Sequence, residues 1–146
     1  MNSKDLFKKE LNNLYAINKQ INDYFNGSEI SFLSEKHQLL LMDYLKFICQ
    51  CEEETSNILD KLEFNPTNTS DSIVKEITEN LNDIVQENID DEIKSSGYLM
   101  SINRLMAYQS ANLENVNYLR TDEINFDLLM QLKEEFQQLK NKLFIK

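Results

Sequence analysis

The 146-residue sequence is poor in the residues that end regular secondary structure, with two glycines and one proline. Sandwiches and doubly wound sheets need many turn residues between their strands, so this shortage argues against both architectures. It favours long helices joined by few connections. A chain of this length suits one domain and can bury a core of its own.

Basic residues are also scarce, because 15 Lys and Arg stand against 25 Asp and Glu and the formal net charge is −10. Binding to a nucleic-acid backbone depends on basic clusters, and so does binding to an anionic membrane surface. We therefore expect neither partner. The chain lacks a run of about 18 apolar residues that could span a bilayer, and its first residues lack the apolar segment of a secretory signal. These absences predict a cytoplasmic protein.

Cysteine and histidine, which are frequent metal ligands and nucleophiles, number two and one. Cys49 and Cys51 lie two positions apart in a helical pattern, which points them about 200° apart around the helix axis. We expect both to be free, buried thiols in a reducing compartment. His37 precedes the apolar part of its segment and is expected at the surface rather than as a ligand. The sequence contains no Glu-x-x-His pair, glycine-rich phosphate loop or nucleophile elbow, so no motif predicts catalysis.

Apolar residues recur at steps of three and four along five segments, as on the buried faces of amphipathic helices. The pattern predicts helices over about 4–25 and 35–63, from about 70 to a break near 89–91, over about 92–119, and from about 122 to the C-terminus. The expected N-caps are Ser3, Ser34, Ser70 or Asp71, Asp90 or Asp91, and Thr121 or Asp122. Long helices with short polar links predict an antiparallel helical bundle.

Polar residues interrupt several of these apolar faces at mid-helix. They are Asn18, the neighbourhood of Glu52 and Thr55, and Glu135. The helix predicted over about 92–119 also carries Asn103, Met106 and Ser110 along one flank. Carboxylates that point inward from several helices of a bundle form di-iron or di-manganese sites, usually together with Glu-x-x-His pairs. A glutamate at the edge of an apolar face can instead reach solvent through its long stem, and spacing alone favours this second interpretation.

The stretch DLFKKELNNLYAINKQ, residues 5–20, resembles the opening helix of the YciE/YciF-like stress proteins, whose pattern is roughly D-L-F-x-x-E-L-x-x-L-Y-x-A-E-K-Q. The positions that match in register are Asp5, Leu6, Phe7, Glu10, Leu11, Leu14, Tyr15, Lys19 and Gln20. Three later stretches occur in the order of the family's other motifs: CEEETSNILDKL, SINRLMAYQSANL and LKEEFQQL. The resemblance implies an all-α, ferritin-like antiparallel four-helix bundle with an additional C-terminal helix. It also implies that two copies of the protein form a homodimer.

Proteins of this family have uncharacterised function, and the resemblance implies inward carboxylates that bind two metal ions. Carried over residue by residue, much of that site is missing. The glutamate of the first helix corresponds to Asn18. The Glu-His-x-Glu positions of the fourth helix correspond to Asn103, Arg104 and Met106. The resemblance therefore implies that two helices have lost their ligands.

The glutamates that the resemblance retains are Glu54 on the second helix and Glu134 and Glu135 on the last. A dinuclear site carries a formal charge on the order of +4, and Glu54 with Glu135 would compensate only half of it. An inward Arg104 would add positive charge, or would form a buried ion pair with Glu135 or Glu54. The metal site is thus expected to be vestigial.

Three hypotheses follow. The first is a non-enzymatic, stress-associated bundle without a cofactor, which acts structurally or through an unknown protein partner. The second is an iron- or manganese-binding protein with ferroxidase or peroxide-related activity that uses Glu52, Glu54, Glu134 and Glu135. The third is an acidic partner-binding bundle unrelated to the family. Asn18→Leu would be tolerated or mildly stabilising if Asn18 is only a leftover polar residue, and would cost about 1–3 kcal/mol if Asn18 belongs to a satisfied buried network.

Overall fold

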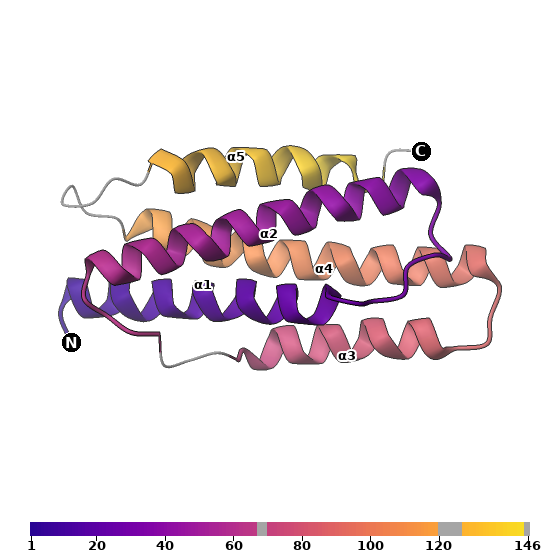
Figure 1. Cartoon of the computed structure of the whole chain (residues 1–146), viewed down its shortest axis with the longest axis horizontal. Coiled ribbons are helices and arrows are strands. Elements are labelled where there is room, and N and C mark those ends of the chain that lie inside the picture. Colours follow the sequence, from indigo (N-terminus) through magenta and orange to yellow (C-terminus); the bar gives the residue numbers. More distant parts are fainter. Residues whose placement is uncertain (67–69, 120–126, 145–146) are drawn as a thin grey trace.

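The computed structural model describes residues 1–66, 70–119 and 127–144, and the side chains of 127–129 lie outside this description. Its regular structure over these residues is entirely helical (Figure 1). The helices are α1 (Ser3–Phe25), α2 (Glu35–Lys61), α3 (Ser72–Gln86), α4 (Asp91–Tyr118) and α5 (Asp127–Lys142). The predicted all-α class and the break between α3 and α4 are confirmed. No described helix is both long enough and apolar enough to cross a membrane.

Side-chain caps explain where the helices begin. Ser34, Asp71 and Asp90 each accept a hydrogen bond from a backbone N–H of the first turn of α2, α3 and α4, as predicted. The cap predicted at Ser3 is wrong, because Asn2 caps α1. Asn2 and Asp5 form a reciprocal capping box, in which each side chain accepts from the other residue's backbone N–H. The cap predicted for the last helix at 121 or 122 lies outside the described residues.

The end of α2 comes two residues before the predicted boundary at residue 63. Glu63 adopts a left-handed conformation with φ of 56°, and the backbone N–H of Phe64 donates to the carbonyl of Leu59 at 2.9 Å. This arrangement satisfies a carbonyl at the helix end, as glycine caps usually do. A local left-handed turn therefore ends the helix before Pro66 has any effect.

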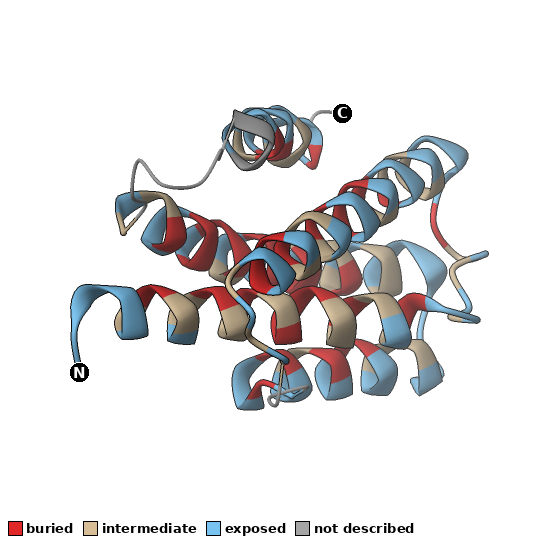
Figure 2. Ribbon diagram, turned by 60° about the vertical axis from the view of Figure 1, so that its left-hand side comes forward, coloured by how far each residue is buried: buried red, intermediate tan, exposed pale blue. Residues whose placement is uncertain are grey.

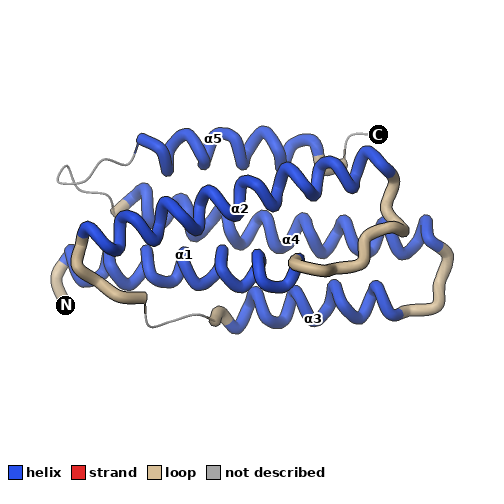
Figure 3. Tube along the Cα trace, in the orientation of Figure 1, coloured by secondary structure: helices blue, strands red, loops and turns tan. Residues whose placement is uncertain are grey.

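Four of the five helices form a closed ring. Helix α1 packs against α2, α2 against α5, α5 against α4, and α4 against α1. Each of these neighbours runs antiparallel to the next (Figure 1). Helix α3 lies outside the ring against α1 and α4. The connection from α2 to α4 therefore returns along the length of the bundle, with α3 as its helical part (Figure 3).

The prediction that the additional helix is the C-terminal one is wrong, because α3 has that position. Helix α3 buries only one narrow stripe, made of Val74, Thr78 and Leu81. Helix α5 contributes an aromatic side chain to the interior of the ring: Phe136 stacks on Phe47 of α2 with ring centroids 4.8 Å apart. A helix with one apolar stripe, such as α3, can cover the outside of a bundle. The fourth helix of the ring, α5, must fill the core between its two neighbours.

Buried residues line the inner faces of the ring and the side of α3 that contacts it (Figure 2). The segment between α1 and α2 is packed: Leu33 is buried, and Ile30 and Phe32 lie against the core. The ring thus encloses one continuous apolar core, and any polar side chain at its centre is removed from solvent.

Candidate functional site

A chain of four polar side chains crosses the centre of the ring. Tyr44 and Cys51 come from α2, Asn18 from α1 and Gln109 from α4, and all four are 0% exposed. The Tyr44 hydroxyl donates to Gln109 Oε1 at 2.8 Å. Gln109 Nε2 donates to Asn18 Oδ1, and Asn18 Nδ2 donates to Cys51 Sγ at 3.2 Å. We call these four residues the central network.

The central network is well satisfied within the protein. Asn18 uses its amide again to donate to the carbonyl of Leu14 at 2.9 Å. The neighbouring buried hydroxyl of Thr55 donates to the carbonyl of Cys51 at 2.8 Å. None of the network's side-chain nitrogen or oxygen atoms is among the buried polar atoms that lack a partner. Because a satisfied buried network costs little and an orphaned member costs a full desolvation penalty, these residues depend on one another.

The network is electrically neutral at physiological pH. The pKa of the Cys51 thiol is raised to about 12, chiefly by burial; the hydrogen bond from Asn18 opposes the rise, and the carboxylates of Glu54 and Glu52 add to it. Burial also raises the pKa of Tyr44 well above its usual value. The two amides carry no charge, so the centre of the bundle holds a thiol, a phenol and two amides.

This donor set does not fit a dinuclear iron or manganese centre. Such a centre needs several carboxylates and imidazoles that balance a charge on the order of +4. Among the residues that the structure describes, no group of three or more His, Cys, Asp or Glu side chains is placed to hold a metal ion. A protonated thiol is a poor ligand because the thiolate is the species that binds metal.

Among the described residues, the hydrogen-bond partner of Asn18 on α4 is Gln109, not one of the three α4 positions that the resemblance pairs with former ligands. Asn103 is half-buried, and Met106 is buried beside Tyr98 and Leu143 in a cavity nearer the start of α4. Arg104 is exposed and lines a groove between α4 and α3. The inward Arg104, with a buried ion pair to Glu135 or Glu54, is therefore not observed.

The glutamates of the predicted site are also spread over the outside of the ring. Glu134 and Glu135 are exposed on α5, where the buried position is Phe136. The expectation that Glu135 interrupts the inner face of this helix is wrong. On α2, Glu54 and Glu52 are half-buried, and Glu52 accepts a hydrogen bond from Asn22 Nδ2 at 3.2 Å.

The remaining chemically active residues divide between surface and interior. Cys49 and Cys51 are both free, but Cys49 is exposed, so the prediction of two buried thiols is wrong for one of them. The angle of about 200° between them is the physical reason, since only one of the two can face the core. His37 is half-buried and lines an apolar cavity at the end of the bundle.

Gln109 is the residue of the central network that sequence reasoning did not identify. It follows Leu105 by four and Met106 by three, and it precedes Leu113 by four, so it continues the buried face of α4. This spacing was available in the sequence. The resemblance directed attention to residues 103–106, one turn earlier, and the partner of Asn18 became visible only when α1 and α4 were packed together.

Comparisons with known proteins found no match for this chain. No family model, no curated protein sequence and no solved structure matches it.

Proposed function

We propose that this protein is a divergent ferritin-like bundle of the YciE/YciF-like kind, in which a neutral hydrogen-bonded network stands where relatives hold metal. Its role would be structural or interactive rather than enzymatic, in the cytoplasm and as a homodimer. The helix arrangement supports the fold. Ferritin-like folds are four-helix bundles with one long crossover connection, and here the connection from α2 through α3 to α4 has that course.

The observation that carries the proposal is the contact between Gln109 and Asn18 at the centre of the ring. Asn18 corresponds to a ligand glutamate in the resemblance, yet both the oxygen and the nitrogen of its side-chain amide are used by protein partners. A metal ion at this place would have to break these bonds, and no group of three or more His, Cys, Asp or Glu side chains among the described residues is placed to hold it. The site is thereby suited to holding α1, α2 and α4 in register.

Metal loading tests the proposal. The purified protein is incubated anaerobically with Fe(II) or Mn(II), desalted and analysed for bound metal. We expect well under 0.1 equivalents per chain, and the same value for Glu54→Ala. One or two equivalents retained through desalting would contradict the proposal. So would oxygen-dependent Fe(II) oxidation that disappears in Glu54→Ala, which would select the iron or manganese hypothesis instead. Sedimentation equilibrium tests the homodimer separately.

A further inference from the structure

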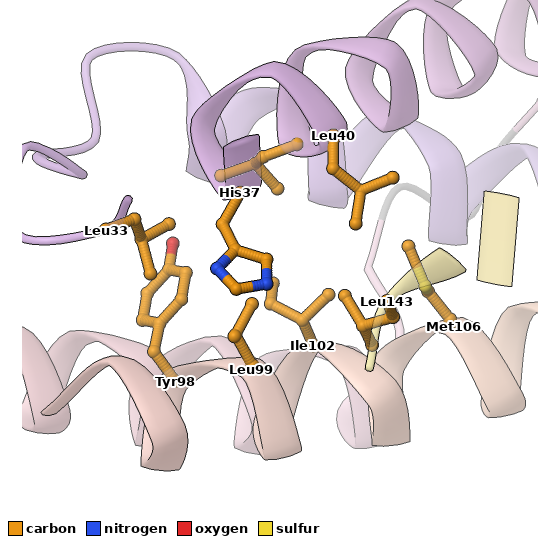
Figure 4. Close-up of a pocket in the computed structure, with 9 residues that line it drawn as sticks. Leu33, His37, Leu40, Tyr98, Leu99, Ile102, Met106 and Leu143 are labelled. Atoms are coloured by element: carbon orange, nitrogen blue, oxygen red, sulfur yellow. The ribbon is translucent and has the colours of Figure 1, made fainter. Parts of the chain in front are cut away.

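Helix α4 has apolar residues on two opposite faces. Its inner face fills the bundle, where Tyr98 and Ile102 point from α4 into the cavity at this end (Figure 4). On the outer face, Ile93 is 63% exposed, Met100 49% and Tyr118 88%. At 3.6 residues per turn, these three side chains lie within about 20° of one another around the helix axis. The outer face of α4 is therefore a continuous apolar surface rather than a set of scattered residues.

The same face is poor in charge. Arg104 is the only charged residue between positions 95 and 113. The exposed face of α3 differs, because it carries Glu76, Glu79 and Asp83 within three turns. The buried centres of protein interfaces are depleted in Lys, Asp and Glu and enriched in Met, Tyr and Arg. The composition of the outer face of α4 is thus typical of a contact surface between proteins.

Six exposed residues form a row along this face, which we call the outer α4 stripe. They are Met100, Arg104, Ala107, Ala111, Glu114 and Tyr118. They follow one another at steps of four, three, four, three and four, which is the spacing of a seam between two helices. This series is the same in both directions along the chain. A second copy of α4 that runs antiparallel across the stripe therefore places each of the six residues opposite another of the six.

The residues that become opposite in this register are chemically complementary. The pairs are Met100 with Tyr118, Arg104 with Glu114, and Ala107 with Ala111. The small alanines lie at the two-fold axis, where they allow the two helices to approach to about 8 Å. Within one chain, neither Arg104 nor Glu114 has an ion-pair partner within 4 Å among the described residues. A parallel arrangement would instead place like charges opposite each other, which repel.

We infer that the outer α4 stripe is the contact surface of an antiparallel, two-fold symmetric dimer of this chain. The inference rests on the homodimer of the proposed function and assigns its interface. Contact between Met100 and Tyr118 removes apolar surface of both copies from water, and two Arg104–Glu114 pairs determine the register. The helices that pack on α4 within the chain are α1, α3 and α5. They leave the stripe exposed, so the dimer needs no rearrangement of the bundle.

Sedimentation equilibrium of charge-swap variants tests the inference over a range of protein concentrations. Arg104→Glu places carboxylates opposite each other at two points of the interface, and Glu114→Arg does the same with guanidinium groups. Each should weaken the dimer at least tenfold. The double variant R104E/E114R should restore it, and so should an equimolar mixture of the two single variants. The two positions are ten residues apart on one helix, about 15 Å, so this recovery requires contact between chains.

Matched variants on α2 control for net charge and surface polarity. Lys46→Glu and Glu53→Arg make similar charge changes at exposed positions of α2, and both should keep the wild-type dimer affinity. Met100→Asp should weaken the dimer at least tenfold, whereas Leu39→Asp, at an apolar position of α2 with 57% exposure, should not.

Arg104 also lines a groove with the carboxylates of Glu76, Glu79 and Asp83 on α3. Arg104→Glu therefore adds repulsion within its own chain. The mixture of single variants distinguishes the two effects, because Glu114→Arg chains can relieve only repulsion across the interface. Circular dichroism and thermal melting verify that each variant is folded.

Unchanged dimer affinity in both single charge-swap variants would overturn the inference and leave the homodimer of the proposed function in place. Weakening without recovery in the double variant and in the mixture would overturn it in the same way, and so would equal weakening by the α2 variants. A wild-type chain that remains monomeric would overturn both this interface and the homodimer. Metal loading tests the rest of the proposed function independently of all these outcomes.

Discussion

Asn18 and Gln109 are polar residues in an apolar core, and hydrogen bonds between helices satisfy both of them. Each is fully buried, and each uses its amide as donor and acceptor at once, so the two side chains join three helices. An amide pair is directional, whereas apolar side chains tolerate small shifts of one helix against another. We therefore interpret the pair as a determinant of helix register.

Asn18→Leu should lower the free energy of unfolding by about 1–3 kcal/mol, because it leaves the amide of Gln109 without its acceptor. Gln109→Leu should have a similar effect. The double variant should lose less than the sum of the two, since residues in one network are not additive. Chemical denaturation measures all three, with Asn82→Leu at an exposed α3 position as the control. An unchanged stability in Asn18→Leu would contradict the role of the network.

The contribution of Cys51 to the stability of the folded protein depends on pH. Its folded pKa of about 12 lies above the value of about 8.5 for an unfolded thiol. A folded pKa that is raised contributes stability that is fully present below the unfolded value and is lost as pH rises toward the folded one. The thiol of Cys51 thus favours the folded state at neutral pH and ceases to do so in alkaline solution.

Between about pH 7.5 and 10, the ionisation of Cys51 should lower the free energy of unfolding by about 2 kcal/mol. The variant Cys51→Ala should lack this part of the alkaline destabilisation, although its stability at neutral pH is lower. Denaturation midpoints across this range measure the difference. Cys49→Ala, at the exposed cysteine, should keep the wild-type pH dependence. Parallel curves for wild type and Cys51→Ala would contradict the prediction.

At the scale of elements, α3 is attached to the ring at its first turn. Asp71 caps α3 through Oδ1 and accepts the Tyr108 hydroxyl of α4 on Oδ2 at 2.7 Å. Its backbone N–H donates to Gln20 of α1 at 2.6 Å. One residue therefore connects α3 to both helices that it covers. Burial and the Asp71 carboxylate raise the pKa of Tyr108 to about 12, so the hydroxyl remains a donor at neutral pH.

Tyr108→Phe should cost about 1–2 kcal/mol, because it removes a donor to a carboxylate and leaves that oxygen without its partner. The loss should be local as well as global. Hydrogen exchange at the start of α3 should accelerate more than exchange in α5, which Asp71 does not contact. Tyr118→Phe, at an exposed tyrosine, is the control. Uniform acceleration over all helices would show that Tyr108 acts through the core instead.

At the scale of the whole molecule, acidic residues outnumber basic ones, 25 against 15. Over the described residues, the ion pair within 4 Å is that between Lys19 and Asp23, one turn apart on α1 at 3.7 Å. Glu76, Glu79 and Asp83 are exposed along α3 at steps of three and four, where like charges repel. The compact state therefore contains net repulsion that salt can screen.

Raising the ionic strength from about 0.02 to 0.3 M should increase the melting temperature by roughly 2–5 °C. The triple variant E76Q/E79Q/D83N should melt higher in low salt and depend less on salt. Three separated acids provide the control: D43N/D60N/E114Q alters the net charge equally at exposed positions that have no adjacent acidic residue. Differential scanning calorimetry in chloride measures the shifts. A melting temperature that falls with salt would contradict this account.

The sequence by itself determined the helical class and most helix boundaries, because periodicity, capping residues and the shortage of glycine act locally along the chain. It also identified Asn18 as a polar residue on an inner face. Packing decided the rest. The pairing of Asn18 with Gln109, the exposure of Glu135, and the place of α3 outside the ring depend on which helices become neighbours. Several helices of this chain have similar apolar stripes, so the stripes alone do not determine which helices pack together. The complete set of tertiary contacts determines it.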